Sequence, residues 1–168
     1  SRVLYNTRRV FKVSTLFVFP LMVYLIFFAK PVIVFIFSSK WEPSAVYFQI
    51  LCFGGMVNAL IHICRNVLKS IGETKSLFLS QIVITSIAIA GMIFFLRFEL
   101  KWLVVWVSAC SYINWIVIGF ITGKKIGYNI FLQLKDIALN IVFSLIAGVL
   151  SYLLFGNLIS NVIVVTLV

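Results

Sequence analysis

Four polar residues spaced along one apolar segment are the first candidates for chemistry. Asn58, His62, Arg65 and Lys69 follow one another at intervals of four, three and four residues, which places them on one face of a helix. Polar groups at membrane depth usually face a bundle interior or a watery cavity, because exposing them to hydrocarbon is costly. An amide, an imidazole and two cations in this order predict the wall of a vestibule with a positively charged mouth.

The two cations also have a simpler explanation, which topology favours. Arg65 and Lys69 stand at the end of an apolar run, where basic residues set orientation and suit the C-terminal helix dipole. Gly72 follows as a left-handed cap. His62 lies further inside the run, and for it a functional role and an interhelical hydrogen bond remain open.

A later apolar segment carries hydroxyl and amide groups among tryptophans. Ser108 and Ser111 are expected to bridge neighbouring helices. Tyr112 and Asn114 are open between helix packing and contact with sugar hydroxyls. We therefore keep both as candidate substrate-binding residues.

Composition defines the broad class of protein. The chain has 168 residues, of which 63% are hydrophobic and 11% charged, with a mean hydropathy of +1.18. Soluble domains carry far more polar surface, so the chain is expected to be an integral membrane protein. Its net charge of +10 lies in short clusters between apolar runs, a pattern typical of membrane topology and not of nucleic-acid binding.

Few residues are suited to catalysis or metal binding. The three cysteines lie in apolar segments, and the chain has one histidine and four acidic residues. This predicts no disulfide framework, no metal site and no cofactor. The phosphate-binding pattern G-x-x-x-x-G-K-[ST] is absent from the sequence, so ATP hydrolysis is not expected. We expect a membrane transporter rather than an enzyme.

The apolar runs predict an all-α integral membrane bundle of about six transmembrane helices. A span needs about 20 apolar residues, and the last run is split at Phe155–Asn157, where Gly and Asn favour a turn. The sixth helix would then be incomplete, and we expect a fragment truncated at both ends. The expected spans are 13–29, 43–64, 76–96, 102–123, 137–155 and 158–168.

Basic residues predict the orientation. Ten of the 14 Lys and Arg residues lie before the first span or in alternate loops, and four lie in the opposite loops. The positive-inside rule then places the N-terminal end and loops 65–75 and 124–136 in the cytoplasm. The loop at 124–136 has Ile126, Ile130 and Leu134 at helical spacing, which favours an amphipathic segment lying on the membrane face.

The stretch FPLMVYLIFFAKPVIVFIFSSKWEPSAVYFQILCFGGMVNALIHICRNVLKSIGETKSLFLSQ resembles the C-terminal region of bacterial polysaccharide exporters. These are O-antigen and lipid-linked oligosaccharide flippases of the multidrug/oligosaccharidyl-lipid/polysaccharide superfamily. Four landmarks carry the resemblance: Pro20, the F-x-x-KW at 37–41, the start of the next span at 49–55, and VLKSIGETK at 67–75. The chain has Ser38-Ser39 where the family often has Gly.

The resemblance implies a transporter of two pseudo-symmetric lobes, with residues 1–168 forming the C-terminal lobe. Such proteins move undecaprenyl-diphosphate-linked glycan across the bacterial inner membrane by alternating access, in lipopolysaccharide and O-antigen biosynthesis. Arg65, Lys69 and His62 would line the cytoplasmic half of the path, and His62 is the candidate for the ion or proton coupling that the family allows. The implied partners are the lipid-linked oligosaccharide, membrane lipids and an N-terminal lobe of the same chain; no nucleic acid is expected.

Other functions remain in competition. A multidrug or small-solute exporter of the same superfamily usually needs membrane-embedded carboxylates, and all four acidic residues are expected near loops. A membrane-bound enzyme of polysaccharide assembly, such as a polymerase, should have a large outer loop, whereas the loops here are short. A structural membrane subunit is the remaining alternative. The acidic residues concerned are Glu42, Glu73, Glu99 and Asp136.

Overall fold

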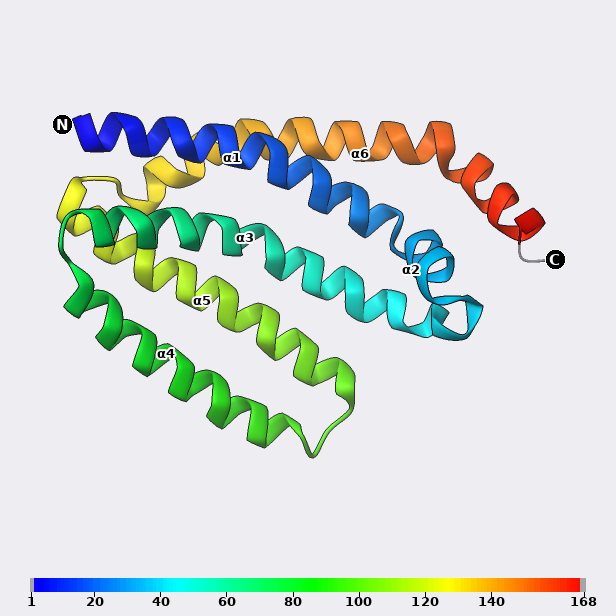
Figure 1. Ribbon diagram of the computed structural model, residues 1–168, viewed down its shortest axis with the longest axis horizontal. Helices are drawn as coiled ribbons and strands as arrows, with labels where there is room; N and C mark the ends of the chain where they lie inside the picture. The colour runs from blue at the N-terminus through cyan, green and yellow to red at the C-terminus, as the bar shows by residue number, and fades with distance from the viewer. Residues whose placement is uncertain (1, 167–168) are drawn as a thin grey trace.

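The computed structural model describes the backbone of residues 2–166 and the side chains of residues 2–151 and 153. Throughout that part the chain is helical, without strands (Figure 1). The expected all-α bundle is confirmed, and five helices in the described residues are long and apolar enough to cross a membrane. The elements are α1 (Arg2–Phe27), α2 (Ala29–Phe37), the short 3₁₀ helix η1 (Ser39–Ser44), α3 (Ala45–Ser70), α4 (Thr74–Phe95), α5 (Leu100–Ile126) and α6 (Ile130–Thr166).

The helices extend beyond the apolar runs that predicted them. α1 starts at Arg2, well before the predicted span 13–29, because basic residues such as Arg8 and Lys12 are good helix formers. It continues through Pro20 and changes direction along its length in Figure 1. A proline inside a helix removes one backbone N–H and commonly produces such a bend.

The predicted turn at Phe155–Asn157 is wrong. α6 runs without interruption from Ile130 to Thr166, so the expected spans 137–155 and 158–168 belong to one helix as far as the described residues reach. A glycine in a helix interior costs only about 1 kcal/mol and an asparagine less. With apolar residues on both sides and no proline after them, these two residues do not end the helix.

α2 and η1 form the short connection between the first two long helices. α2 is a nine-residue apolar helix with Pro31 in its first turn, where the missing backbone N–H is tolerated. Lys30 of α2 pairs with Glu42 of η1 at 2.8 Å. Trp41 is 54% exposed, which suits the headgroup region, where an amphipathic ring is stable.

α3 is the central helix of the bundle. It packs against α1 on one side and α5 on the other, while α4 packs on α5 and α6 packs on α1. Gly54 allows the close approach of α5, since a Cβ there would lie 3.0 Å from Ser108 Oγ. α5 and α6 touch little although they are consecutive, and α3 and α4 diverge from their connecting turn (Figure 1).

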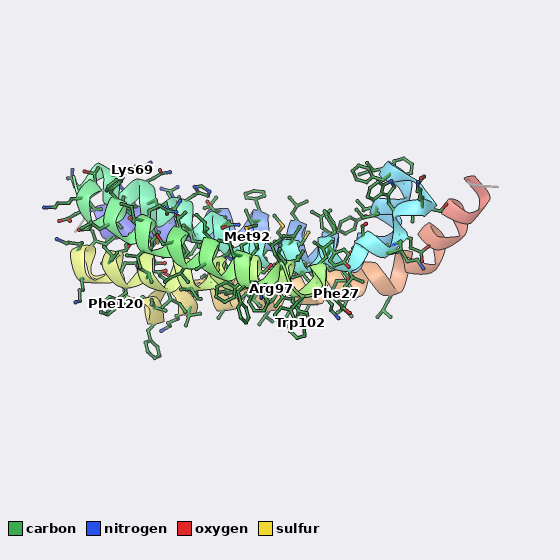
Figure 2. The ribbon with its side chains drawn as sticks, turned by 90° about the horizontal axis from the view of Figure 1, so that it is seen from below. Phe27, Lys69, Met92, Arg97, Trp102 and Phe120 are labelled. Carbon is green, nitrogen blue, oxygen red and sulfur yellow. The ribbon has the colours of Figure 1, made fainter. Side chains whose placement is uncertain are left out.

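One end of the bundle collects the positive charge. The start of α1, the α3–α4 turn and the α5–α6 turn lie at this end in Figure 1. We call it the basic end; Figure 2 shows Lys69 there and Arg97 and Trp102 further along the molecule. Its exposed cations include Arg2, Arg9, Lys69, Lys75, Lys124, Lys125 and Lys135.

Candidate functional site

The polar stripe of α3 faces α4. Asn58, His62 and Lys69 are exposed and Arg65 is half-buried. The Arg65 Nη2 donates a hydrogen bond to Gln81 Oε1 on α4. Because the four residues share one helical face, this contact turns the whole stripe toward the space where α3 and α4 diverge.

The other sides of that space also carry polar groups. A cavity of about 300 Å³ lies along α4 and α5, and Gln81 Nε2 donates to Thr85 Oγ1 at 3.0 Å on its α4 side. Gln81 lines this cavity and accepts the hydrogen bond from Arg65, so the cavity adjoins the α3 stripe at Arg65; we call the cavity and the stripe together the polar groove. Four polar residues line the cavity: Gln81, Thr85, Ser111 and Asn114.

Asn114 has an unused acceptor in the groove. Its Oδ1 is buried and has no hydrogen-bond partner among the described residues. An unsatisfied buried amide oxygen is costly, and a water or a ligand hydroxyl would satisfy it. Asn114 is therefore the predicted residue whose position best fits contact with a polar ligand.

Tyr112 lies elsewhere. Its hydroxyl donates to the Phe53 carbonyl at 3.0 Å, and its ring lies 5.3 Å from the Phe53 ring. Tyr112 lines a different, apolar cavity together with residues of α1 and α6. Asn114 thus shares a cavity with Gln81, the residue that Arg65 contacts, whereas Tyr112 lines a different cavity and packs on Phe53 of α3.

An ion cluster joins α1 to α6, and the sequence reading missed it. The Asp136 side chain is only 4% exposed. Arg8 donates to both of its oxygens, from Nε at 2.7 Å and from Nη2 at 2.8 Å. Lys12 Nζ lies 3.3 Å from Oδ1. All four acidic residues were expected near loops, with no carboxylate buried in the bundle. Asp136 contradicts this expectation, because its carboxylate is buried.

A network of polar side chains extends the ion cluster along α6. The Tyr128 hydroxyl donates to Asp136 Oδ2 at 3.1 Å, and burial, reinforced by this carboxylate, raises the pKa of Tyr128. Asn140 Nδ2 donates to Thr15 Oγ1 of α1 at 2.6 Å. Gln133 accepts a hydrogen bond from Trp115 Nε1 of α5 at 3.1 Å.

The structure differs from the expectation that residues 124–136 form an amphipathic segment on the membrane face. α5 continues to Ile126 and α6 begins at Ile130, so only a short turn separates them. The apolar spacing of Ile126, Ile130 and Leu134 suggested a helix lying on the membrane. The missed signal is the polar spacing on α6, where Gln133, Asp136, Asn140 and Ser144 recur every three or four residues and are buried.

The turn between α3 and α4 is stabilised by a left-handed glycine and by an ion pair between Glu73 and α5. Gly72 adopts φ +81°, which confirms the predicted left-handed cap. Glu73 Oε1 pairs with Lys125 Nζ of α5 at 2.5 Å and Glu73 Oε2 accepts from Ser76 at 2.9 Å. The hydrogen bond from Lys125 lowers the pKa of Glu73. Part of this charged turn is therefore structural, while Lys69 makes no ion pair among the described residues.

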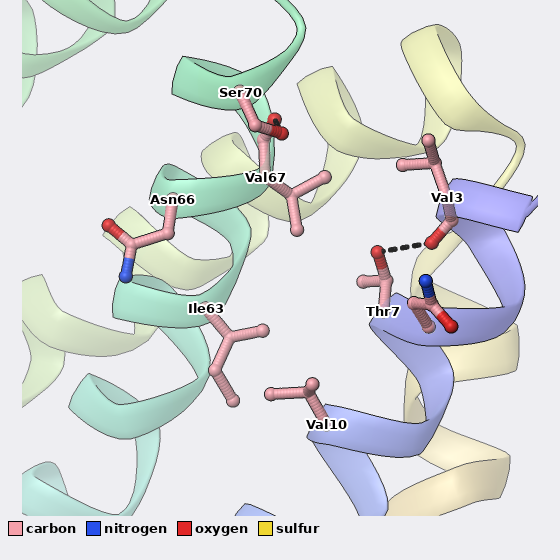
Figure 3. Close-up of a pocket in the computed structure, with 8 residues that line it drawn as sticks. Val3, Thr7, Val10, Ile63, Asn66, Val67 and Ser70 are labelled. Carbon is pink, nitrogen blue, oxygen red and sulfur yellow. Dashed lines mark hydrogen bonds between the residues drawn. The ribbon is translucent and has the colours of Figure 1, made fainter.

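A second polar pocket of about 400 Å³ lies between α1 and α3 at the basic end (Figure 3). Its hydroxyls are occupied within their own helices. Thr7 Oγ1 donates to the Val3 carbonyl at 2.7 Å, and Ser70 Oγ to the Val67 carbonyl at 2.7 Å. Asn66 points away from α1. The pocket therefore offers less to a ligand than the polar groove.

Comparison with known protein families gives a match to the start of the chain. The sequence model of a family described as "Polysaccharide biosynthesis protein" matches residues 1–46. No curated protein and no solved structure matches the chain. The matched region spans α1, α2 and η1 and includes Arg8 and Lys12 of the ion cluster, but it ends before the groove residues of α3. The chain is thus a multi-pass helical membrane protein whose first 46 residues are similar to polysaccharide biosynthesis proteins.

Proposed function

We propose that this chain is part of a translocase for lipid-linked oligosaccharide, acting by alternating access in the bacterial inner membrane. It would form the C-terminal lobe of a larger transporter and move undecaprenyl-diphosphate-linked glycan to the outer leaflet. The observation that carries this proposal is the polar groove, with cations at its basic end and an unsatisfied amide oxygen inside. The family match to residues 1–46 supports the connection with polysaccharide biosynthesis.

The groove chemistry suits a diphosphate followed by sugars. A guanidinium binds phosphate oxygens in a bidentate manner, and an ammonium adds a mobile point charge. Arg65 is only half-buried and Lys69 is exposed, so both can reach an anionic headgroup. Further inside, Gln81, Thr85 and Asn114 supply donors and acceptors for sugar hydroxyls.

Export of cationic drugs, the alternative function, fits the charges of the structure less well than translocation of an anionic lipid. Asp136 is a buried carboxylate after all, but Arg8 and Lys12 neutralise it. It lies between α1 and α6, away from the polar groove. The groove therefore keeps its positive charge, which repels cations.

Export of glycan in a bacterium lacking its own translocase tests the proposal. The complete protein should restore surface glycan, and Arg65→Ala with Lys69→Ala should abolish it at unchanged membrane levels. The matched control is Arg97→Ala with Lys101→Ala, an exposed Arg and Lys in the α4–α5 region, which should leave export intact. Normal export by the Arg65/Lys69 variant would remove the substrate role of these cations.

A further inference from the structure

The apolar cavity that Tyr112 lines is separate from the polar groove. It has a volume of about 510 Å³ and is bounded by α1, α3, α5 and α6. Phe19 and Val23 line it from α1, Met56 and Leu60 from α3, and Ile141 and Leu145 from α6. None of the described residues that line it is charged.

The polar atoms beside this cavity are all engaged in hydrogen bonds. The Tyr112 hydroxyl donates to the Phe53 carbonyl, Trp115 Nε1 to Gln133 Oε1, and Ser144 Oγ to the Asn140 carbonyl. An ordered buried water needs about two to four polar partners. Each of these donors already makes a hydrogen bond and is not free to bind a water molecule. The cavity therefore suits a hydrocarbon ligand better than water.

The size of the cavity fits one hydrocarbon chain. An apolar cavity of about 150 Å³ accommodates benzene. The present volume is more than three times larger, which leaves room for roughly twenty carbon atoms on that scale. This corresponds to one acyl chain rather than two.

Access is provided between α5 and α6. These helices touch little, and the α6 side chains that line the cavity are also partly open to the outside: Leu134 is 47%, Ile141 41% and Leu145 48% exposed. In a membrane that outside is lipid. A chain can therefore enter sideways from the bilayer.

Charge near one end of the cavity favours an anionic headgroup. Lys135 directly follows the lining residue Leu134 and is exposed. Lys12 lies on α1, seven residues before Phe19, and its side chain is 55% exposed even though it contacts Asp136. A phosphate at the basic end would lie beside these ammonium groups while its chain filled the cavity.

We propose that this cavity binds one acyl chain of an anionic phospholipid, which enters between α5 and α6 with its phosphate toward Lys12 and Lys135. The site is distinct from the polar groove. Val57, Ile61 and Ile118 are buried in the contact between α3 and α5, and this contact separates the groove from the cavity. A glycan carrier held at Arg65 has no direct path through it, so the bound lipid is a separate molecule.

Mass spectrometry of the complete protein, released from the membrane in mild detergent, tests the site. The wild type should retain a phospholipid such as phosphatidylglycerol. Leu145→Trp fills the cavity from α6 and should reduce retention about tenfold or more, the effect of excluding about two methylene groups from burial. Ile141→Trp should act in the same way. The matched control is Leu139→Trp, at a 65% exposed position of α6 that does not line the cavity, and it should retain the lipid.

Each outcome decides the proposal. Loss of lipid in both cavity variants but not in the control supports it, provided that all three proteins elute as the same species in size-exclusion chromatography. If a cavity variant misfolds, added phosphatidylglycerol must raise the Tm of the wild type more than that of a Lys12→Ala, Lys135→Ala variant. No retained lipid, equal retention in all variants, or retention of an isoprenoid phosphate instead would overturn the proposal. Glycan export is measured separately, so its failure leaves this result interpretable.

Discussion

At the scale of single residues, Asp136 holds two helices together by charge. Its carboxylate accepts the bidentate guanidinium of Arg8 and approaches Lys12, while Tyr128 donates a further hydrogen bond. A buried carboxylate is tolerated only when its oxygens are satisfied in this way. Removing its charge leaves both cations at the α1–α6 contact without their partner.

We predict that Asp136→Asn lowers the Tm of the purified protein clearly. Glu42→Gln is the control, because the pair of Glu42 with Lys30 is solvent-exposed on both sides and exposed ion pairs contribute little. Thermal unfolding in detergent, followed by circular dichroism, measures both variants. Equal Tm values for Asp136→Asn and Glu42→Gln would show that the ion cluster does not stabilise the bundle.

A second residue-scale prediction concerns the contact of α4 with α5. A Cβ at Gly91 would lie 2.1 Å from the Trp106 ring, and the Trp106 Nε1 donates to the Ala88 carbonyl at 3.2 Å. Gly91→Ala should therefore destabilise the protein by about 1–3 kcal/mol through overpacking. Gly55→Ala is the matched control, because the added Cβ would meet only Met22, no closer than 3.4 Å. Reversible unfolding that shows no difference between these two variants would contradict the packing.

At the scale of elements, the α3–α4 turn is tied to the end of α5 by Glu73 and Lys125. This pair, with help from Ser76, lowers the pKa of Glu73 below its ordinary value of 4.5. A carboxylate whose folded pKa is depressed stabilises the fold above its unfolded pKa. That contribution is lost as the pH falls from about 4.5 through the lower folded pKa.

The expected result is a steeper loss of Tm in the wild type than in Glu73→Gln when the pH falls below about 4.5. Glu99→Gln, which removes a carboxylate that makes no ion pair among the described residues, should follow the wild-type profile. Parallel profiles for the wild type and Glu73→Gln would show that the pair does not form in solution.

The elements also show how far the sequence could lead. Apolar length predicted the helices of the first four spans, and helical spacing predicted the α3 stripe that Arg65 turns toward α4. The polar face of α6 was missed because Gln133 and Asp136 stood just outside an apolar run, where a loop is the usual expectation. Their burial depends on Arg8 and Trp115, which are distant in sequence, so no local pattern could reveal it. Tyr112 and Asn114 are two residues apart and lie on different faces of α5; only the packing of α3 and α4 tells which one meets the groove.

At the scale of the whole molecule, the basic end fixes the expected orientation. The positive-inside rule places this end in the cytoplasm. Single cysteines at Ser76 and Asn129, in a variant lacking the three native cysteines, should be protected from an impermeant thiol reagent added to intact cells. A cysteine at Phe98, in the α4–α5 connection, should be labelled. Labelling with the opposite pattern would invert the proposed topology and place the cations of the groove on the wrong side to receive substrate.

The most direct test of the translocase is transport in proteoliposomes. The complete protein is reconstituted into vesicles that carry a fluorescent lipid-linked oligosaccharide, and the fraction accessible to a membrane-impermeant quencher is followed in time. If the protein translocates this lipid, exchange between leaflets is faster than in empty vesicles, is abolished in the Arg65→Ala, Lys69→Ala variant and persists in the Arg97→Ala, Lys101→Ala variant. Exchange no faster than in empty vesicles, with correctly folded protein and a range of glycans, would contradict the proposed function.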